Sequence, residues 1–277
     1  MSPPEADPWS PVALPNARGR QVRSAATGAD YRLCLAVPPG PPPPEGFATI
    51  YVLDGATTFA CLADTVGRLG RRGDATGVSP AIVVGIGSAT GDLHDVVRRH
   101  LDFTPGRSTD DDPLLARVET GGADRFLAFI EDEVKPLVAG LHPVDPARQS
   151  LLGHSLAGYF VLQALAARAS AFSAFGTVSP SIWWDRDRLV AALEAAPGAG
   201  ARAYIAVGGR EEEVYEPPLS EAQARRARRR MVGHAHEIGE LLRRRLGAER
   251  TLFEVLPDED HASVVPTAFV RFLRFLG

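Results

Sequence analysis

The sequence predicts an α/β fold in which a mainly parallel central sheet carries helices on both faces and antiparallel strands on its N-terminal side. Three observations support this prediction: short apolar runs rich in β-branched residues, helical patterns between most of them, and a chain of 277 residues of which 45% are hydrophobic. A chain of this size accommodates one ordinary α/β domain. We therefore expect a single domain over residues 16–277, preceded by a flexible, low-complexity tail over residues 1–15.

The first predicted strand, Asp30–Val37, alternates apolar and polar residues as a half-exposed antiparallel strand does. The proline-rich run Pro38–Pro44 then predicts a turn, because consecutive prolines cannot donate hydrogen bonds to a sheet. Phe47–Leu53 and Ala81–Ile86 are apolar with almost no alternation, which is typical of strands buried on both faces of a parallel sheet. Weaker runs of the same kind predict four further strands: Ser150–Leu152, Phe172–Val178, Ala203–Val207 and Thr251–Leu256.

Helical patterns lie between most of these runs, and such alternation predicts a mainly parallel sheet. The stretch Ser88–Gly122 has little periodicity, and long loops inside compact domains are commonly functional or disordered. The predicted helices are Thr57–Leu69, Ala123–Leu141, Leu156–Ala167, Arg186–Ala195, Ser220–Leu246 and Val265–Phe275.

Composition and spacing exclude several classes of protein. The formal net charge of −4 argues against a nucleic-acid-binding protein, which normally carries a basic face. The two cysteines, Cys34 and Cys61, can form neither a disulfide framework nor a zinc site, and the glycine-rich segment Gly85–Gly91 lacks the spacing of a dinucleotide site. The N-terminus has no signal-peptide pattern, and the longest uncharged stretch, Gln149–Ala167, is too polar to span a membrane. We expect a cytoplasmic protein with no metal, no cofactor, no nucleic-acid partner and no membrane contact. The sequence leaves the oligomeric state open.

The segment Leu151–Gly158 has the pattern of a nucleophile elbow, in which a strand turns sharply into a helix at a serine. Small residues before and after the serine keep side chains from colliding in the turn, and the helix N-terminus supplies N–H groups to a developing oxyanion. Gly153 fits this pattern, whereas Ala157 stands where glycine is usual. A helix N-cap is the alternative role for such a serine, and we interpret Ser155 as the nucleophile.

A serine hydroxyl needs a base, and the α/β-hydrolase chain order places the acid and then the histidine after the serine. Three histidines follow the serine. His234 and His236 lie in a predicted Arg-rich helix, where two residues of separation turn them to different sides, and we interpret them as solvated. His261 directly follows the last predicted strand, where the base must lie, and is the predicted base.

The acid is predicted from the strand Ala203–Val207, which ends in two glycines, an arginine and three glutamates. A carboxylate just past a strand end can reach the Nδ1 atom of the histidine. Glu211 is our assignment because it lies at the end of the glycine turn. Acidic runs are most often solvated loops, and other carboxylates remain open as alternatives: Glu212, Glu213, Asp258 and Asp260.

Six short motifs occur in one order along the chain: Tyr51–Gly55, Arg99–Pro105, Gly121–Phe126, Gly153–Ser155, Ser179–Trp184 and Asp260–Ser263. Together they resemble the esterase D-like (putative-esterase) family of α/β hydrolases. Within that family they look most similar to the branch of siderophore trilactone esterases, typified by the enterobactin and salmochelin esterases. The resemblance runs from about Val22 to the C-terminus.

The resemblance implies an α/β-hydrolase fold and a serine carboxylesterase, with Ser155 as nucleophile, His261 as base and Glu211 as acid. The siderophore branch varies at its acid, so a serine–histidine dyad stays open as an alternative to a triad. The resemblance also implies an oxyanion hole: Leu156 supplies one backbone N–H, and the turn at Gly55 and Ala56 supplies the second.

The same resemblance places three further side chains near the substrate. Arg99 belongs to the motif that lies near the substrate in the siderophore branch, and its planar fork suits oxygen-rich anions and aromatic rings. The alternative is that Arg99 pairs with Asp102 or another loop carboxylate and holds the loop. Trp183 and Trp184 are expected either to stack on a ring of the substrate or form a wall of the site, or else to pack beneath the nucleophile loop.

These observations predict an esterase that forms an acyl-enzyme on Ser155 and acts on a small-molecule ester, favouring a siderophore or related aryl-acyl or lactone ester. A ferric siderophore is one form that this substrate can take. Two alternatives remain: another acyl-transfer hydrolase on the same scaffold, such as a thioesterase, S-formylglutathione hydrolase or acyltransferase, and a catalytically silent binding protein.

Overall fold

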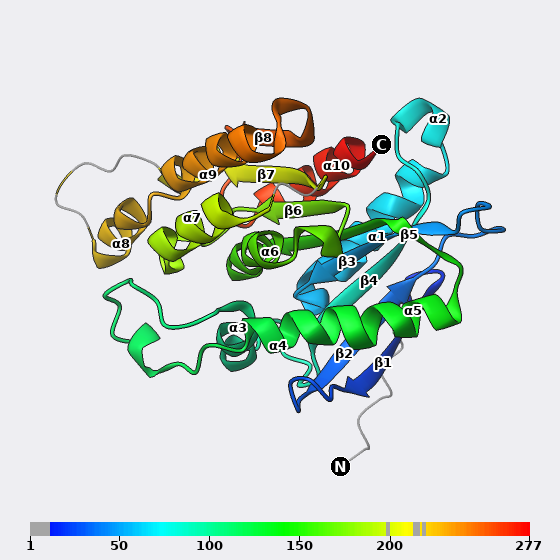
Figure 1. Cartoon of the computed structure of the whole chain (residues 1–277), viewed down its shortest axis with the longest axis horizontal. Coiled ribbons are helices and arrows are strands. Elements are labelled where there is room, and N and C mark those ends of the chain that lie inside the picture. The colour runs from blue at the N-terminus through cyan, green and yellow to red at the C-terminus, as the bar shows by residue number, and fades with distance from the viewer. Residues whose placement is uncertain (1–11, 198–199, 213–216, 218–219) are drawn as a thin grey trace, which may run out of the picture.

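The computed structural model describes residues 12–197, 200–212, 217 and 220–277 (Figure 1). Residues 1–11 of the predicted tail lie outside the described residues, as does Glu213 among the candidate acids.

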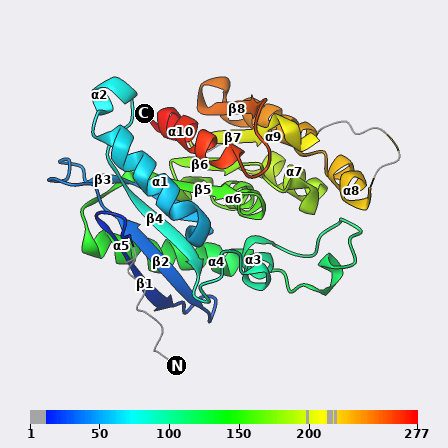
Figure 2. The ribbon, with the colours of Figure 1, turned by 180° about the vertical axis from the view of Figure 1, so that it is seen from behind.

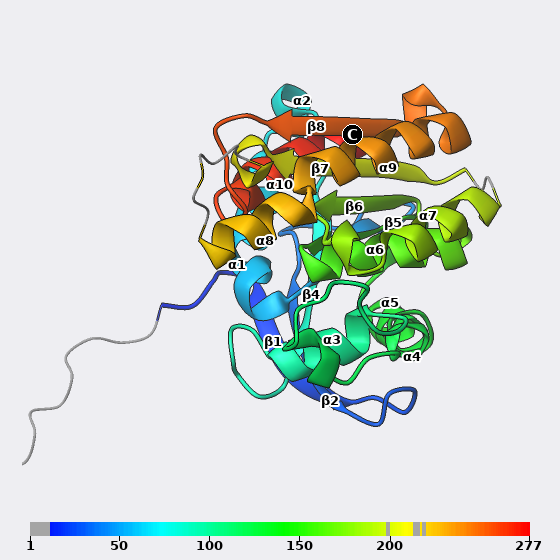
Figure 3. The same ribbon diagram turned by 90° about the vertical axis from the view of Figure 1, so that its left-hand side faces the viewer.

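Eight strands form one sheet, and their bounds are β1 (Ala17–Arg23), β2 (Asp30–Ala36), β3 (Phe47–Leu53), β4 (Ala81–Ser88), β5 (Val144–His154), β6 (Ala174–Val178), β7 (Arg202–Gly208) and β8 (Thr251–Leu256). Their order is β1-β2-β4-β3-β5-β6-β7-β8. The strands β1 and β2 pair antiparallel, β2 pairs antiparallel with β4, and all remaining pairs are parallel. Figure 3 shows β1 and β2 at one end of the sheet and β8 at the other. The predicted fold class, an α/β-hydrolase fold with a mainly parallel sheet, is confirmed.

Helices cover both faces of this sheet: α1 (Gly55–Gly70), α2 (Gly73–Thr76), α3 (Val96–Phe103), α4 (Ala123–Ala128), α5 (Lys135–Leu141), α6 (Leu156–Ala167), α7 (Arg186–Ala195), α8 (Glu221–Arg229), α9 (Met231–Leu246) and α10 (Val264–Leu276). Apolar side chains of α3 to α7 and α9 join one buried cluster, and those of α1 and α10 join the cluster on the opposite face. Figure 2 shows α1 and α10 together in front of the sheet. None of the helices in the described part of the chain is long and apolar enough to cross a membrane.

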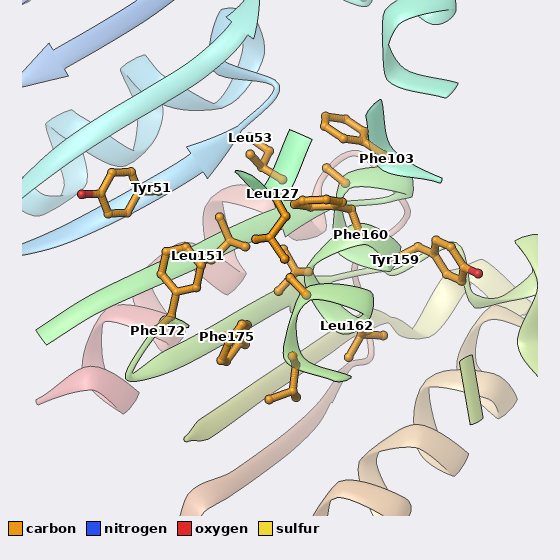
Figure 4. Packing of buried hydrophobic residues seen from close by; sticks show 14 of the residues in the cluster. Tyr51, Leu53, Phe103, Leu127, Leu151, Tyr159, Phe160, Leu162, Phe172 and Phe175 are labelled. Carbon is orange, nitrogen blue, oxygen red and sulfur yellow. The ribbon is translucent and has the colours of Figure 1, made fainter. Parts of the chain in front are cut away.

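The central strand β3 shows why its sequence is apolar without alternation. Successive side chains of a strand point to opposite faces. Ile50 and Val52 accordingly join the cluster under α1 and α10, while Tyr51 and Leu53 join the larger cluster on the other face. Figure 4 shows that larger cluster, with Phe160 of α6 lying over the sheet. Both faces of the strand are therefore buried, and both must be apolar.

The structure differs from the sequence prediction where local signals were weak or misleading. Antiparallel N-terminal strands were expected, but no residue range was predicted for β1, because its residues are largely polar and exposed at the edge of the sheet. The stretch Ser88–Gly122, expected to have little regular structure, contains α3. The strand predicted over Ser150–Leu152 extends back to Val144 in β5, and β6 begins at Ala174, later than predicted.

Two predicted helices are also interrupted. The helix expected over Ser220–Leu246 is two helices, because Arg230 adopts the left-handed conformation with φ 43° between α8 and α9. The helix expected over Ala123–Leu141 contains a π-helical segment, Phe129–Val134, between α4 and α5.

Gly176 in β6 tests the packing of α10 against the sheet. A Cβ atom at Gly176 would lie 2.6 Å from Phe272 Cε2 and 2.7 Å from Leu152 Cδ1. Overpacking of this kind typically costs about 1–3 kcal/mol, so we expect Gly176→Ala to lower the free energy of unfolding by that amount. Urea denaturation followed by circular dichroism measures the change.

The matched control is Gly67→Ala in α1, where an added Cβ would meet nothing within 4 Å. Alanine is favoured over glycine inside a helix by roughly 0.5–1 kcal/mol, so this variant should be at least as stable as the wild type. Equal stability of the two variants would contradict the close packing of α10 on β6.

Candidate active site

Ser155 lies at a sharp turn between β5 and α6. Its backbone has φ 59° and ψ −122°, a conformation that costs energy for a residue with a side chain. A Cβ at Gly153 would lie 2.5 Å from the carbonyl oxygen of Ala157, so only glycine fits there. Ala157 is completely buried, which shows that its methyl group is accommodated where glycine is usual. The local sequence therefore builds a turn that projects the serine side chain from the strand end.

Glu211 and His261 follow the adjacent parallel strands β7 and β8, so both emerge at the same edge of the sheet as Ser155. Gly208 lets the loop after β7 approach the loop after β8 closely. A Cβ at Gly208 would lie 2.5 Å from the carbonyl oxygen of Glu259, and the N–H of Arg210 donates to that oxygen at 3.0 Å. The glycine turn thus brings the acid to the histidine loop.

The three side chains form one chain of hydrogen bonds. His261 Nδ1 donates to Glu211 Oε2 at 2.5 Å, and Ser155 Oγ donates to His261 Nε2 at 3.0 Å. The Glu211 side chain is only 3% exposed. Its other oxygen accepts hydrogen bonds from the N–H of Gly208 at 2.8 Å and from the hydroxyl of Ser179. The buried carboxylate is therefore fully bonded in a single orientation.

The alternative acids that the structure describes are directed elsewhere. Glu212 accepts a hydrogen bond from the N–H of Gly233 at 2.7 Å. Asp260 accepts from the N–H groups of Ala262 and Ser263 in its own loop. Asp258 is exposed. Of these carboxylates, the one hydrogen-bonded to the His261 ring is Glu211.

His154 and Ser179 are two site residues that the sequence analysis missed. His154 Nε2 donates to the backbone carbonyl of His261 at 2.8 Å, and the two rings lie 4.7 Å apart. Burial, together with the nearby His261, lowers the pKa of His154 to about 3. The sequence signal that could have identified these two site residues was their position: His154 immediately precedes Ser155, and Ser179 directly follows β6, the strand next to β5.

The proposed oxyanion donors all lie at helix N-termini. Gly55 and Ala56 begin α1, and Leu156 begins α6. The first N–H groups of a helix have no partner within the helix and are available to an anion. A Cβ at Gly87 would lie 3.3 Å from the nitrogen of Gly55, so β4 packs closely against the start of α1.

Arg99 makes a bidentate ion pair with Asp54 at the start of α1. Its Nε donates to Asp54 Oδ1 at 2.8 Å and its Nη2 to Oδ2 at 3.0 Å. Asp102, named above as the alternative partner, instead binds Arg98 and accepts a hydrogen bond from the Tyr31 hydroxyl at 2.8 Å. The partner of Arg99 is therefore the carboxylate that directly precedes Gly55 and Ala56, the predicted oxyanion donors.

The two tryptophans have different environments. Trp184 is completely buried; its Nε1 donates to the carbonyl of Gly106 at 3.0 Å, and its own carbonyl accepts from the N–H of Thr109. These hydrogen bonds hold Gly106 and Thr109, in the long connection that follows β4, against Trp184. Trp183 is half-buried, with the Arg229 guanidinium 3.6 Å from its ring centroid, and it lines an open pocket of about 450 Å³.

His234 and His236 lie in α9 and make no hydrogen bond to the serine or its partners. His234 contributes to the lining of the Trp183 pocket. No group of three or more His, Cys, Asp or Glu side chains is placed to hold a metal ion within the described residues.

The chain is similar to known esterases. The chain matches the family described as Putative esterase over residues 24–237. It is 32% identical over 273 residues to the ferri-bacillibactin esterase BesA of Bacillus subtilis. That match covers 95% of this chain and 90% of BesA.

Solved structures share the fold over nearly the whole chain. The BES protein from Bacillus cereus superimposes with a TM-score of 0.79 and 30% identity, covering 99% of each chain. The siderophore hydrolase EstB from Aspergillus nidulans has a TM-score of 0.79 and 27% identity, covering 97% of this chain and 96% of that one. The chain therefore belongs to the Putative esterase family and is a carboxylic ester hydrolase with an α/β-hydrolase fold.

Proposed function

We propose that the protein is a serine esterase that hydrolyses a siderophore ester through an acyl-enzyme on Ser155. The observation that supports this most strongly is the hydrogen-bond chain from Ser155 through His261 to a buried Glu211, built on a strained strand-to-helix turn. Its order and contacts are those by which a histidine and a carboxylate activate a serine hydroxyl.

In the proposed reaction, Ser155 Oγ attacks the ester carbonyl while its proton passes to His261 Nε2. The imidazolium then protonates the leaving alkoxide, and Glu211 stabilises the positive charge and holds the Nδ1 proton. Water attacks the acyl-enzyme with His261 again as base, which releases the carboxylic acid and restores the serine hydroxyl.

The tetrahedral intermediates of both steps carry an oxyanion, which we assign to the backbone N–H groups of Gly55, Ala56 and Leu156. Donors aimed at such an oxyanion commonly account for about 10²–10³ of rate each.

The siderophore part of the proposal is supported by the relatives. BesA is a ferri-bacillibactin esterase, and EstB is a siderophore hydrolase. The His261 side chain is 48% exposed, so its ring can be reached by an ester from solvent. We propose that Trp183 contacts the substrate: its ring borders an open pocket, although the residues that line this pocket do not include Ser155, Glu211 or His261. Turnover of a panel of siderophore lactones, p-nitrophenyl acetate and S-formylglutathione separates this function from other acyl-transfer activities.

We expect Ser155→Ala and His261→Ala each to lower kcat for p-nitrophenyl acetate by on the order of 10⁶, to near background. The double variant should be no worse than either single one, because the two groups act as a unit. Steady-state assays with purified variants, and labelling of the wild type with a fluorophosphonate, provide the measurements. Residual activity of Ser155→Ala above a few per cent, or additive losses, would contradict the assignment.

For the acid, we expect Glu211→Gln to lower kcat by about 10²–10⁴, because the glutamate orients and stabilises rather than reacts. The matched control is Glu212→Gln, the neighbouring glutamate that binds the N–H of Gly233. We expect that variant to stay within a few-fold of the wild type. If both variants keep wild-type kcat, the enzyme works as a serine–histidine dyad.

His154 makes stability depend on pH. Its pKa is 6.5 when unfolded and about 3 when folded, so between these values the unfolded chain binds a proton that the native chain does not. The free energy of unfolding should therefore fall as the pH drops from about 6.5 towards 3. We expect His154→Gln, which keeps a donor for the His261 carbonyl, to reduce the loss of stability between pH 7.5 and 5. The control His236→Gln, on the exposed face of α9, should keep the wild-type loss in urea titrations at both pH values.

A further inference from the structure

We propose that Arg99 is a positioning residue of the oxyanion hole, which acts by clamping Asp54 and so fixing the N–H groups of Gly55 and Ala56. The inference rests on the proposed function, since it concerns the hole in which the ester oxyanion forms. It gives Arg99 a different role from the substrate contact expected from the sequence.

The first support is the backbone of Asp54. This residue has φ 54° and ψ 47°, in the left-handed region that residues with side chains seldom occupy. Its carbonyl accepts hydrogen bonds from the N–H groups of Thr57 at 2.9 Å and Thr58 at 3.2 Å. A trans peptide unit holds its C=O and N–H in opposite directions. With the carbonyl turned into α1, the N–H of Gly55 in the same peptide points out of the helix.

The second support is what the Asp54 side chain does not do. Aspartate at a helix N-cap normally turns its carboxylate onto the first N–H groups of the helix. Asp54 makes no such cap bond, and its two oxygens are instead bound by Arg99 Nε and Nη2. Without Arg99, the carboxylate would be free to bind the N–H of Ala56, the second residue of the helix, which is one of the donors that the ester oxyanion needs. The ion pair thus keeps a competing anion out of the hole.

The third support is the rigidity and burial of the clamp. The Asp54 and Arg99 side chains are 7% and 19% exposed, and bidentate charged pairs of this kind have fixed geometry. The helix α3 that carries Arg99 is anchored by its N-cap, Asp95, which accepts from the Ser88 hydroxyl at 2.6 Å and the N–H of Arg98 at 2.9 Å. The end of β4 therefore holds the clamp in register with the start of α1.

The test uses Arg99→Ala in the full chain, assayed with p-nitrophenyl acetate and with a catecholate trilactone. We expect kcat to fall about tenfold to a hundredfold on both substrates, with each KM changed less than threefold. The matched control is Arg98→Ala, which breaks the neighbouring ion pair to Asp102 on the same helix, with a similar exposure. That control should lower the melting temperature but keep kcat within about threefold.

A second variant separates clamping from general damage. Glycine adopts the left-handed region freely and has no carboxylate to compete for the donors. We therefore expect Asp54→Gly to restore at least part of the kcat lost in Arg99→Ala, so that the double variant is several-fold faster than Arg99→Ala alone. A matched pair of oxygen and thiono esters adds a readout at the oxyanion itself: the preference for the oxygen ester should shrink in Arg99→Ala and not in Arg98→Ala.

Any one of the following results would overturn the inference. A loss confined to KM of the trilactone would make Arg99 a substrate contact, and equal kcat losses in Arg98→Ala and Arg99→Ala would make it a structural residue. A double variant no faster than Arg99→Ala would remove Asp54 as the intermediary. The Ser155→Ala variant keeps these outcomes separate from the proposed function: if it stays active, the serine mechanism fails, whereas if it is inactive and Arg99→Ala is normal, only the clamp fails.

Discussion

Parallel pairing of four adjacent strands is the constraint on which the site depends. Because β5, β6, β7 and β8 lie side by side and run in one direction, their ends meet at one edge of the sheet. Ser155 follows the first of these strands, Ser179 the second, Glu211 the third and His261 the fourth. Neighbouring strands are about 4.8 Å apart, so roughly 10 Å separates the backbones that carry the serine and the acid. The histidine from the last strand reaches back across this gap, and its ring joins the two side chains through two hydrogen bonds.

Backbone strain is concentrated at the same edge. Of the non-glycine residues in the described part of the chain with positive φ, Asp54, Ser155 and Ser179 each directly follow a strand of the parallel sheet. Each strained residue is held by bonds that relaxation would break. The N–H of Ser155 donates to the carbonyl of Val178, the Ser179 hydroxyl donates to Glu211, and Asp54 is bound by Arg99. Strain of this kind persists only where the surroundings hold it in place, and here those surroundings are the site itself.

Charged groups at the site are distributed so that each anion has a fixed partner. The Glu211 carboxylate is buried between two loops and bonded at both oxygens, while the Asp54 carboxylate is neutralised by Arg99. His154 beside them remains uncharged, because burial holds its pKa far below the ordinary value. In the proposed mechanism the negative charge that develops on the ester oxygen therefore meets helix N-termini rather than a competing carboxylate. Of the three hydrogen-bonded side chains, Glu211 is buried, whereas Ser155 and His261 are partly exposed and can meet the ester and water.

The sequence by itself determined the fold class and the main strands and helices, and it predicted Ser155 as nucleophile, His261 as base and Glu211 as one of several candidate acids. These depend on local patterns: apolar runs, the glycine before the serine, and polar residues after strand ends. It did not locate β1, whose polar residues are stabilised by pairing with β2 rather than by burial, or the break at Arg230 inside a continuous helical pattern. Only the tertiary structure decided which carboxylate meets the histidine, since Glu211 and Glu212 are neighbours in sequence but point to different partners. It also decided the partner of Arg99, because an ion pair across 45 residues depends on how α3 and α1 pack at the sheet edge, and no local pattern records that contact.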